Sequence, residues 1–402
     1  MKNLVVNERR AMVKRPDPKL PKRKKIIIYA LTIILSVAYI YFGRQIALQG
    51  YPEWEDPAEE PMTVRVTEIV SDSVSNNERV IVFNAEVLNG ELEGDTITSD
   101  QTIYANYYPQ QEPVSVGDKV LVFANTYTEG MDWSMLEYFR SDSILILGIV
   151  FAAIILIFGR FKGVNTLISL AFTVLAVFAV FVPSVLSGQN IYLWSIITCI
   201  YTIVMTMLLI NGADKKSFAA GMGCFLGVAI AGILTVIMDK VLLLTGMLNE
   251  DTLYLQMVQT QSPIDLKGII FAAIIIGAMG AIMDVAMDIS SSLNELRTNI
   301  PDISSARLIK SGFNIGRDVM GTMANTLILA FVGGSFVSLI VIAANSMQFA
   351  QLLSTDTIVM EILQGIACTS GVVLTVPITS FIAVEVLYKE KKENVGADES
   401  AP

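Results

Sequence analysis

Long apolar runs dominate the pattern of hydrophobic and polar positions along this chain. Uninterrupted runs of about 18 or more apolar residues predict membrane-spanning helices. Eight apolar runs of about this length occur, two of which contain a single carboxylate, at Ile26–Phe42, Ser143–Gly159, Val164–Ser184, Ile191–Ile210, Phe218–Met238, Gly268–Met287, Met320–Ala344 and Ile362–Leu387. The pattern predicts a polytopic α-helical membrane protein with about eight transmembrane helices.

A different rhythm occupies the region between the first two runs. Residues 63–69 alternate between polar and apolar side chains, and short apolar segments follow at Val80–Phe83 and Val120–Phe123, beside turn residues such as Gly90 and Gly117. Short alternating strands separated by Gly and Asn are typical of small β-barrels and sandwiches. We expect a small all-β domain, an OB-like barrel, with its β core at 63–130.

Charge divides the chain in the same way. The 402 residues are 53% hydrophobic and only 16% charged, with a net charge of −10, whereas soluble domains carry about 25% charged residues. Residues 1–25 hold ten Lys or Arg against two acids, and residues 44–142 hold five against nineteen. The net charge of the whole chain therefore averages a basic tail with an acidic domain.

Topology follows from the positions of the basic residues, because cytoplasmic segments are enriched in Lys and Arg. Twenty-one of the 28 basic residues fall in five segments that we assign to the cytoplasm: residues 1–25, 160–163, 211–217, 288–318 and 389–402. The predicted domains are then a cytoplasmic tail at 1–25, an uncleaved transmembrane anchor at 26–43, an acidic extracytoplasmic domain at 44–142 that begins with a Pro- and Glu-rich linker at 44–62, a seven-helix membrane domain at 143–388 and a cytoplasmic tail at 389–402. This arrangement predicts a multi-pass protein of the cell membrane.

Composition removes several classes of chemistry. The chain has no histidine, so imidazole metal ligands and Ser-His or Cys-His nucleophiles are excluded. Its three cysteines, Cys199, Cys224 and Cys368, lie inside apolar runs and are expected to be buried small hydrophobes. An acidic chain does not favour nucleic acid as a partner. No Walker A loop, dinucleotide fingerprint or Cys-x-x-Cys motif occurs, so we expect no enzyme activity, no cofactor and no metal site.

Carboxylates within the run at Gly268–Met287 are the clearest candidates for function. Asp284 lies sixteen residues after Gly268, roughly 24 Å along a helix axis. A carboxylate at the centre of a spanning helix costs about 2.5–3.5 kcal/mol on insertion scales, so such a group is a functional candidate by default. Helical steps of three and four place on one face the residues Gly277, Ala281, Asp284, Asp288 and Ser291.

The next run begins with a second polar stripe, which should lie at the same depth. Asp318, Thr322 and Asn325 share one helix face, and Arg317 is adjacent. The candidate residues for binding an ion or substrate are Asp284, Asp288, Asp318, Thr322 and Asn325. We expect Asp284 to accept the ion or proton, Asn325 to be a neutral ligand, and Arg317 to form a gating pair with Asp318. A structural interpretation stays open, in which Asp288 and Asp318 mark the ends of their spans and Asp284 pairs with Arg317.

Three further features are interpreted as helix packing or have two alternative interpretations. Gly223-x-x-x-Gly227 matches a helix-contact motif and is expected to pack against another helix. Pro377 lies among the hydroxyls of Thr375, Thr379 and Ser380, which either line a path or serve packing. The segment from 239 to 267 is long and partly apolar, and it either lies along the interface or re-enters the bilayer.

Two ungapped blocks of this sequence resemble a known family. Residues 277–290, GAMGAIMDVAMDIS, and residues 316–330, GRDVMGTMANTLILA, are similar to the signature of the YibE/F-like family of bacterial multi-pass membrane proteins. The resemblance covers roughly residues 140–388, and the anchor with its β domain resembles longer members from Gram-positive bacteria. Members of that family are described as predicted permeases or as membrane proteins of unsettled function, and its motif residues fall on Asp284, Arg317, Asp318 and Asn325. Asp288 stands where a serine is expected in many relatives.

Two functions of different classes remain open from the sequence. The leading hypothesis is a permease, a secondary-transport-like protein with a polar site between its sixth and seventh helices. The alternative is an envelope sensor or assembly platform that binds a partner through the extracytoplasmic β domain. The expected partners are the lipid bilayer, a paralogous membrane subunit or a second copy of the chain, and an envelope partner of the β domain. A lipid-directed membrane enzyme is a third interpretation, but no nucleophile pattern supports it.

Overall fold

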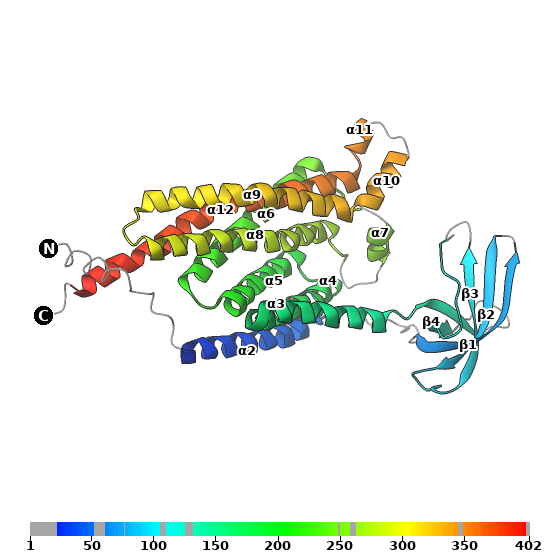
Figure 1. Ribbon diagram of the computed structural model, residues 1–402. Helices are drawn as coiled ribbons and strands as arrows, with labels where there is room; N and C mark the ends of the chain where they lie inside the picture. Colours follow the sequence, from blue (N-terminus) through cyan, green and yellow to red (C-terminus); the bar gives the residue numbers. More distant parts are fainter. Residues whose placement is uncertain are drawn as a thin grey trace. The chain divides into compact units, whose positions relative to one another are not determined.

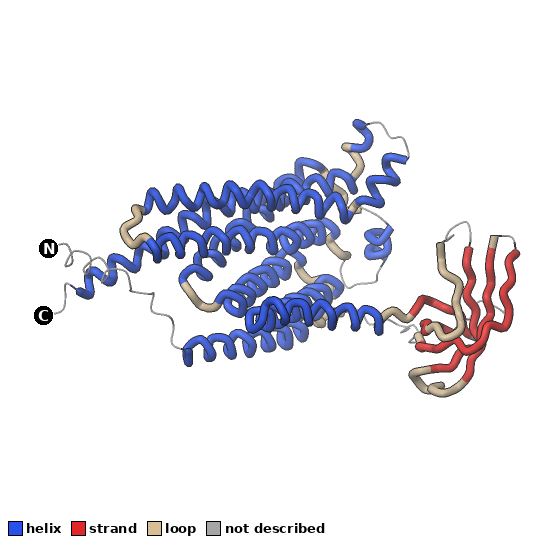
Figure 2. Tube along the Cα trace, in the orientation of Figure 1, coloured by secondary structure: helices blue, strands red, loops and turns tan. Residues whose placement is uncertain are grey.

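The structure is a computed structural model that describes residues 22–51, 61–75, 77–104, 110–124, 132–247, 250–257, 263–344 and 349–398. The chain divides into two compact units, one made of Met1–Pro52 with Phe161–Pro402 and the other of Glu53–Arg160. Figure 2 shows that all strands belong to the second unit, whereas the first is helical. Most of the predicted basic tail and of the linker lies outside the described residues, and so do the last residues of the C-terminal tail.

The smaller unit contains a closed five-stranded barrel. Its strands are β1 (Met62–Ser75), β2 (Glu78–Val87), β3 (Thr96–Tyr104), β4 (Lys119–Ala124) and β5 (Trp133–Tyr138). They follow one another around the barrel as β1-β2-β3-β5-β4, and β4 pairs with β1 to close it. All of these pairs are antiparallel except β3 with β5, which is parallel. The small all-β domain is confirmed, and β5 extends it beyond the predicted end at residue 130.

The barrel core explains which strands were predictable. Val64, Phe83, Val120 and Val122 are completely buried, and they come from the alternating segments recognised in the sequence. Strand β3 was missed because its centre is polar and yet buried, at Ser99, Asp100 and Gln101. Hydrogen bonds, most of them to distant parts of the barrel, hold the last two side chains. Asp100 accepts hydrogen bonds from the hydroxyls of Thr102 and Ser134, and Gln101 bonds the backbone of Glu112 and Val114.

Helices make up the larger unit and the end of the smaller one (Figure 1). Their bounds are α2 Lys22–Ala47, α3 Ser141–Ala176, η1 Val177–Phe181, α4 Val182–Leu186, α5 Ile191–Thr206, η2 Met207–Asn211, α6 Lys215–Leu242, α7 Glu250–Met257, α8 Leu266–Asn299, α9 Ser305–Gly334, α10 Phe336–Ala344, α11 Phe349–Leu352 and α12 Asp356–Asp398, where η marks a π-helical turn. Within the described residues, six helical stretches are long and apolar enough to cross a membrane.

Two differences separate these six stretches from the eight predicted runs. The stretch Ser141–Leu186 contains two of the runs, and its backbone departs from helical geometry at Arg160 (φ 48°, ψ −129°), where two helices meet. The run predicted at Met320–Ala344 is divided at Ser335 between α9 and α10 and is not among the six. The polar start of α9 lowers its apolar content, because the helix begins fifteen residues before the predicted run.

The segment 288–318, predicted as a loop, is mostly helical. Helix α8 continues to Asn299 and α9 begins at Ser305, so only five residues connect them. The side chain of Ser304 caps α9 by accepting a hydrogen bond from the amide of Arg307, which fixes the start of that helix. Asp288 and Asp318 therefore lie well inside their helices.

Helix α12 is the common partner of α6, α8 and α9 in the core of the larger unit. Figure 1 shows it running beside them. Its residues Thr375 and Thr379 are completely buried against α6, where a Cβ added at Gly227 or Gly223 would overlap a threonine hydroxyl. The packing role predicted for Gly223-x-x-x-Gly227 is confirmed.

A second pair of glycines allows α9 to pack closely against α12. A Cβ at Gly312 would press on Ser380, and one at Gly316 would overlap Val376. The hydroxyls of Thr375 and Ser380 bond carbonyls of their own helix, four residues earlier. The hydroxyls around Pro377 thus serve close helix packing, which small residues permit.

The segment from 239 to 267 contains the end of α6, the short helix α7 and the start of α8. Residues 248–249 and 258–262 lie outside the described part.

Candidate polar site on helices α8 and α9

Helix α8 carries the predicted stripe on its exposed side. Gly277, Gly280, Asp284 and Asp288 are all exposed, whereas the opposite side of α8, with Ile274, Ile282 and Ile289, is completely buried. No atom comes within 4 Å of a Cβ built at Gly280. The two carboxylates, one helical turn apart, therefore lie on an open surface of the chain.

Helix α9 also turns its polar stripe outward. Its core side is formed by Gly312 and Gly316, which are buried, and by Met323, which packs on the core. Asp318 follows Gly316 by two residues and Asn325 follows Met323 by two, a rotation of about 200°. Asp318 and Asn325 consequently point away from the core and are exposed.

The remaining two predicted residues on α9 are exposed as well. Arg317 precedes Asp318 on the outer side, and the Thr322 hydroxyl donates a hydrogen bond to the carbonyl of Val319 in its own helix. Thr322 is therefore available to a ligand as an acceptor. Its position one turn after Asp318 continues the stripe.

The two stripes lie at one level along the hairpin of α8 and α9. Leu293 of α8 touches the Gly312 position of α9. The two helices run in opposite directions from this contact and rise equally per residue. Five residues from it, Asp288 of α8 is therefore level with Arg317 of α9, and nine residues from it, Asp284 is level with Gly321. The depth predicted from the sequence agrees with this register.

The stripes do not, however, contact each other. No ion pair or hydrogen bond joins Asp284 or Asp288 to Arg317 within the part of the chain that the structure describes. The structural ion pair considered for Asp284 and Arg317 is therefore absent there. The physical reason is the rotation of α9 about its own axis, which turns its glycines and methionines toward the core and its charged residues outward.

Sequence reasoning missed a polar residue on α12. The amide nitrogen of Gln364 is the atom nearest a Cβ built at Gly277, at 3.8 Å. Gln364 is half-buried, so it adds a neutral polar group beside the α8 stripe. Glu361, one turn earlier, is also half-buried. The signal was present, because both residues interrupt an apolar helix, but they stood at the edge of the predicted run.

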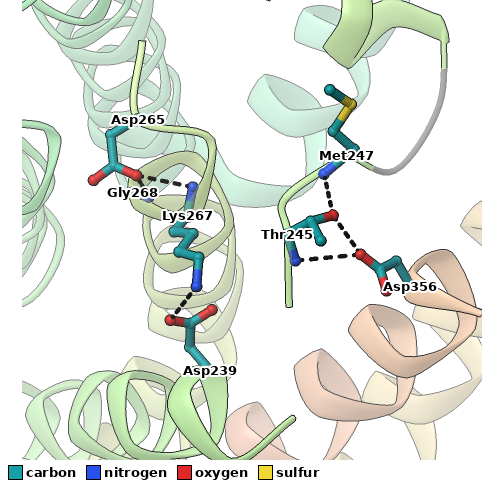
Figure 3. A network of polar contacts seen from close by, with 7 residues as sticks. All are labelled: Asp239, Thr245, Met247, Asp265, Lys267, Gly268 and Asp356. Carbon is teal, nitrogen blue, oxygen red and sulfur yellow. Dashed lines mark hydrogen bonds and ion pairs between the residues drawn. The ribbon is translucent and has the colours of Figure 1, made fainter. Parts of the chain in front are cut away.

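A separate polar network holds the opposite end of the helical unit together (Figure 3). The Lys267 ammonium lies 3.2 Å from the Asp239 carboxylate, and Asp265 caps α8 by accepting hydrogen bonds from the amides of Lys267 and Gly268. The Asp356 carboxylate accepts hydrogen bonds from the amide and hydroxyl of Thr245, at 3.2 and 2.5 Å. These contacts connect α6 with α8, and the loop after α6 with α12.

Metal-binding chemistry has no counterpart in the described residues. Among them, no group of three or more His, Cys, Asp or Glu side chains is arranged to hold a metal ion. Cys199, Cys224 and Cys368 are free and buried, as their apolar setting predicted.

Comparison with known families matches residues 147–389 to the model of the YibE/F-like protein family. The chain belongs to the YibE/F-like family. The matched region includes α5, α6, α8, α9 and α12 up to residue 389, and both polar stripes lie within it. The resemblance noted for residues 277–290 and 316–330 is thereby confirmed. No curated protein and no solved structure matches the chain.

Proposed function

We propose that this YibE/F-like protein is a multi-pass protein of the cell membrane and acts as a permease subunit, moving a small ion or polar solute along the stripes of α8 and α9. The observation that carries this proposal is the exposure of charged and amide side chains at one level on two adjacent helices. In a bilayer an exposed carboxylate at this depth would cost about 2.5–3.5 kcal/mol. Something other than lipid must therefore cover the stripes.

The simplest cover for the polar stripes is a second protein chain together with water. Glycines at 277, 280 and 321 leave open space along the same surface, so another helix can approach closely. The partner is a second copy or a paralogous membrane subunit, and the polar path runs between the chains. The termini face the cytoplasm in this arrangement, following the positive-inside rule.

Each residue has a role in the proposed path. Asp284 accepts the proton or cation, Asn325 and Gln364 offer neutral ligands, and Arg317 with Asp318 gates the cytoplasmic end. Asp288 lies level with Arg317, so its charge attracts the guanidinium and stabilises the closed gate. No cofactor, metal or catalytic step is required, and the protein is not an enzyme in this proposal.

Ion flux into proteoliposomes tests the proposal. Full-length protein is reconstituted with a trapped pH-sensitive dye, and proton flux is measured under an imposed sodium or potassium gradient. We expect Asp284→Asn to reduce flux at least tenfold, because it removes the group that binds the ion. Glu295→Gln is the matched control, since it makes the same change of charge near the end of α8. Equal flux through wild type and Asp284→Asn, with the control also unchanged, contradicts the proposal.

The barrel supports a second candidate function. It has its own hydrophobic core, and the region around it is strongly acidic. We infer that it is an OB-like barrel, because its strand order and its parallel β3–β5 pair suit that fold, whose faces commonly bind ligands. Replacing residues 62–138 with a flexible linker separates the two functions. Flux that survives the replacement favours the permease, whereas loss of a specific co-purifying envelope protein favours the sensor or platform.

A further inference from the structure

An apolar groove runs between α5 and α6, on a surface distinct from the polar stripes. Its first part has a volume of about 670 Å³ and lies between the π-helical end of α5 and the first turns of α6. A second part of about 430 Å³ continues along the same two helices. Ile200, Ile203 and Phe225 line both parts, so they form one continuous groove.

The length of the groove matches a bilayer. Along α6 it extends from Ser217 to Ile237, which is about 30 Å at 1.5 Å per residue, close to the thickness of the hydrocarbon core. Its walls are almost entirely aliphatic and aromatic. This shape suits extended hydrocarbon chains and excludes a polar solute.

The groove begins at a polar mouth. Ser217 lines the groove and is only 4% exposed, and its buried hydroxyl has no hydrogen-bond partner. A buried hydroxyl without a hydrogen-bond partner costs roughly 1–3 kcal/mol, so a bound ligand that supplies the partner is the natural explanation. The hydroxyl therefore marks the position of a polar atom supplied from outside the chain.

Charge at this mouth selects the kind of ligand. Lys215 and Asp214 both line the mouth, Lys216 follows Lys215 at the start of α6, and the Asp214 side chain makes no capping hydrogen bond to α6. The Asp214 carboxylate therefore accepts no hydrogen bond from the amides of the first turn of α6, and only the Asp214 carbonyl accepts one, from the amide of Phe218. Uncapped amides at a helix start favour a phosphate oxygen.

We infer that this groove is a binding site for one anionic phospholipid, with its phosphate at Ser217 and the start of α6 and its acyl chains along α5 and α6. The phosphate accepts the hydrogen bond from the Ser217 hydroxyl, and Lys215 and Lys216 balance its charge. The π-helical turn η2 contributes Met207 and Leu208 to the wall of the groove. This site is independent of the proposed path on α8 and α9.

Native mass spectrometry of the full-length chain in detergent tests the inference. Phosphatidylglycerol and phosphatidylcholine with identical acyl chains are titrated in turn, and bound lipids are counted. We expect phosphatidylglycerol to be retained at least tenfold more strongly than phosphatidylcholine. Equal retention of the two lipids overturns the anionic assignment.

Two variants locate the site. Ser217→Ala removes one hydrogen bond to a charged group, which should weaken phosphatidylglycerol binding about tenfold. It should leave the stability of the lipid-free protein unchanged or raised, because that hydroxyl has no partner in the chain. Gly221→Leu should reduce binding by filling the groove, since a Cβ there meets only Ile203 and Met207, at 3.9 Å.

The controls separate this site from general lipid contact. Gly148→Leu adds the same side chain where no atom lies within 4 Å and should leave lipid binding unchanged. Glycerol phosphate, which carries the headgroup without the chains, should not displace the lipid. Displacement by glycerol phosphate, or wild-type retention in both Ser217→Ala and Gly221→Leu, overturns the inference.

Discussion

Gly223 of α6 lies so close to Thr379 of α12 that a single added methyl group would overlap the threonine hydroxyl. Both residues are in the densest part of the helical unit, and Thr379 is completely buried. The same relationship recurs one turn further on, between Gly227 and Thr375. Glycine residues therefore set the distance between α6 and α12.

Gly223→Ala should destabilise the protein by about 1–3 kcal/mol, because overpacking forces a shift of α6 or α12. Thermal unfolding of the full-length protein in detergent measures this change. Gly321→Ala on α9 is the control, since its new Cβ meets nothing within 4 Å and alanine favours helix. Combining Gly223→Ala with Thr379→Ala should restore part of the loss. Equal melting temperatures for the Gly223→Ala and Gly321→Ala proteins would contradict the prediction.

Asp356→Ala should loosen the loop after α6. The carboxylate accepts two hydrogen bonds from Thr245, and bonds to a charged acceptor contribute about 1.5–3 kcal/mol each when well protected. Hydrogen–deuterium exchange should become faster in peptides that contain Thr245. Peptides from the barrel serve as an internal reference, and unchanged exchange at Thr245 would refute the role of Asp356.

Acid should weaken the β1–β2 hairpin. The Arg79 guanidinium, bonded to the Asp72 carboxylate at 2.7 and 3.0 Å, holds the pKa of that carboxyl below its ordinary value of 3.8. A lowered folded-state pKa means that the contribution is present above the unfolded pKa and is lost as the pH falls through the folded value. Hydrogen exchange of the hairpin at low pH should exceed that of the barrel core. Asp72→Asn, compared at each pH, should abolish the difference in pH response between hairpin and core.

Cysteine cross-linking should detect the second chain at the outer side of α9. Positions 314, 321 and 328 repeat every seven residues on that side, and single cysteines placed there should give disulfide-linked dimers in membranes. The native cysteines are buried and give little background. Met323→Cys, on the core side, should remain monomeric. Monomers from all three outer positions would count against a partner of the same chain and favour a paralogous one.

Much of the fold could be predicted from the sequence, because membrane-type helices and alternating strands leave strong periodic signals. The runs near Ile191–Ile210 and Phe218–Met238 became α5–η2 and α6 with small changes of boundary. Strand β3 could not be found, since Asp100 and Gln101 are buried through hydrogen bonds with distant parts of the barrel. Nothing local distinguishes such a segment from a polar loop.

The site was only partly predictable for a related reason. Steps of three and four correctly grouped Asp284 with Asp288, and Asp318 with Asn325, because a helix fixes which residues share a face. The direction of each face depends on the neighbours. Gly312 and Gly316 turn the other side of α9 toward α12, and this long-range contact is invisible in the local pattern.

Helix α12 also imposes an order on biosynthesis. It follows both α6 and α9 in the sequence, yet its segment from Thr375 to Ser380 fills the glycine surfaces of both helices. Those surfaces lack this partner until α12 has been synthesised. A nascent chain that ends before α12 therefore contains two helices whose glycine surfaces are not yet covered by α12.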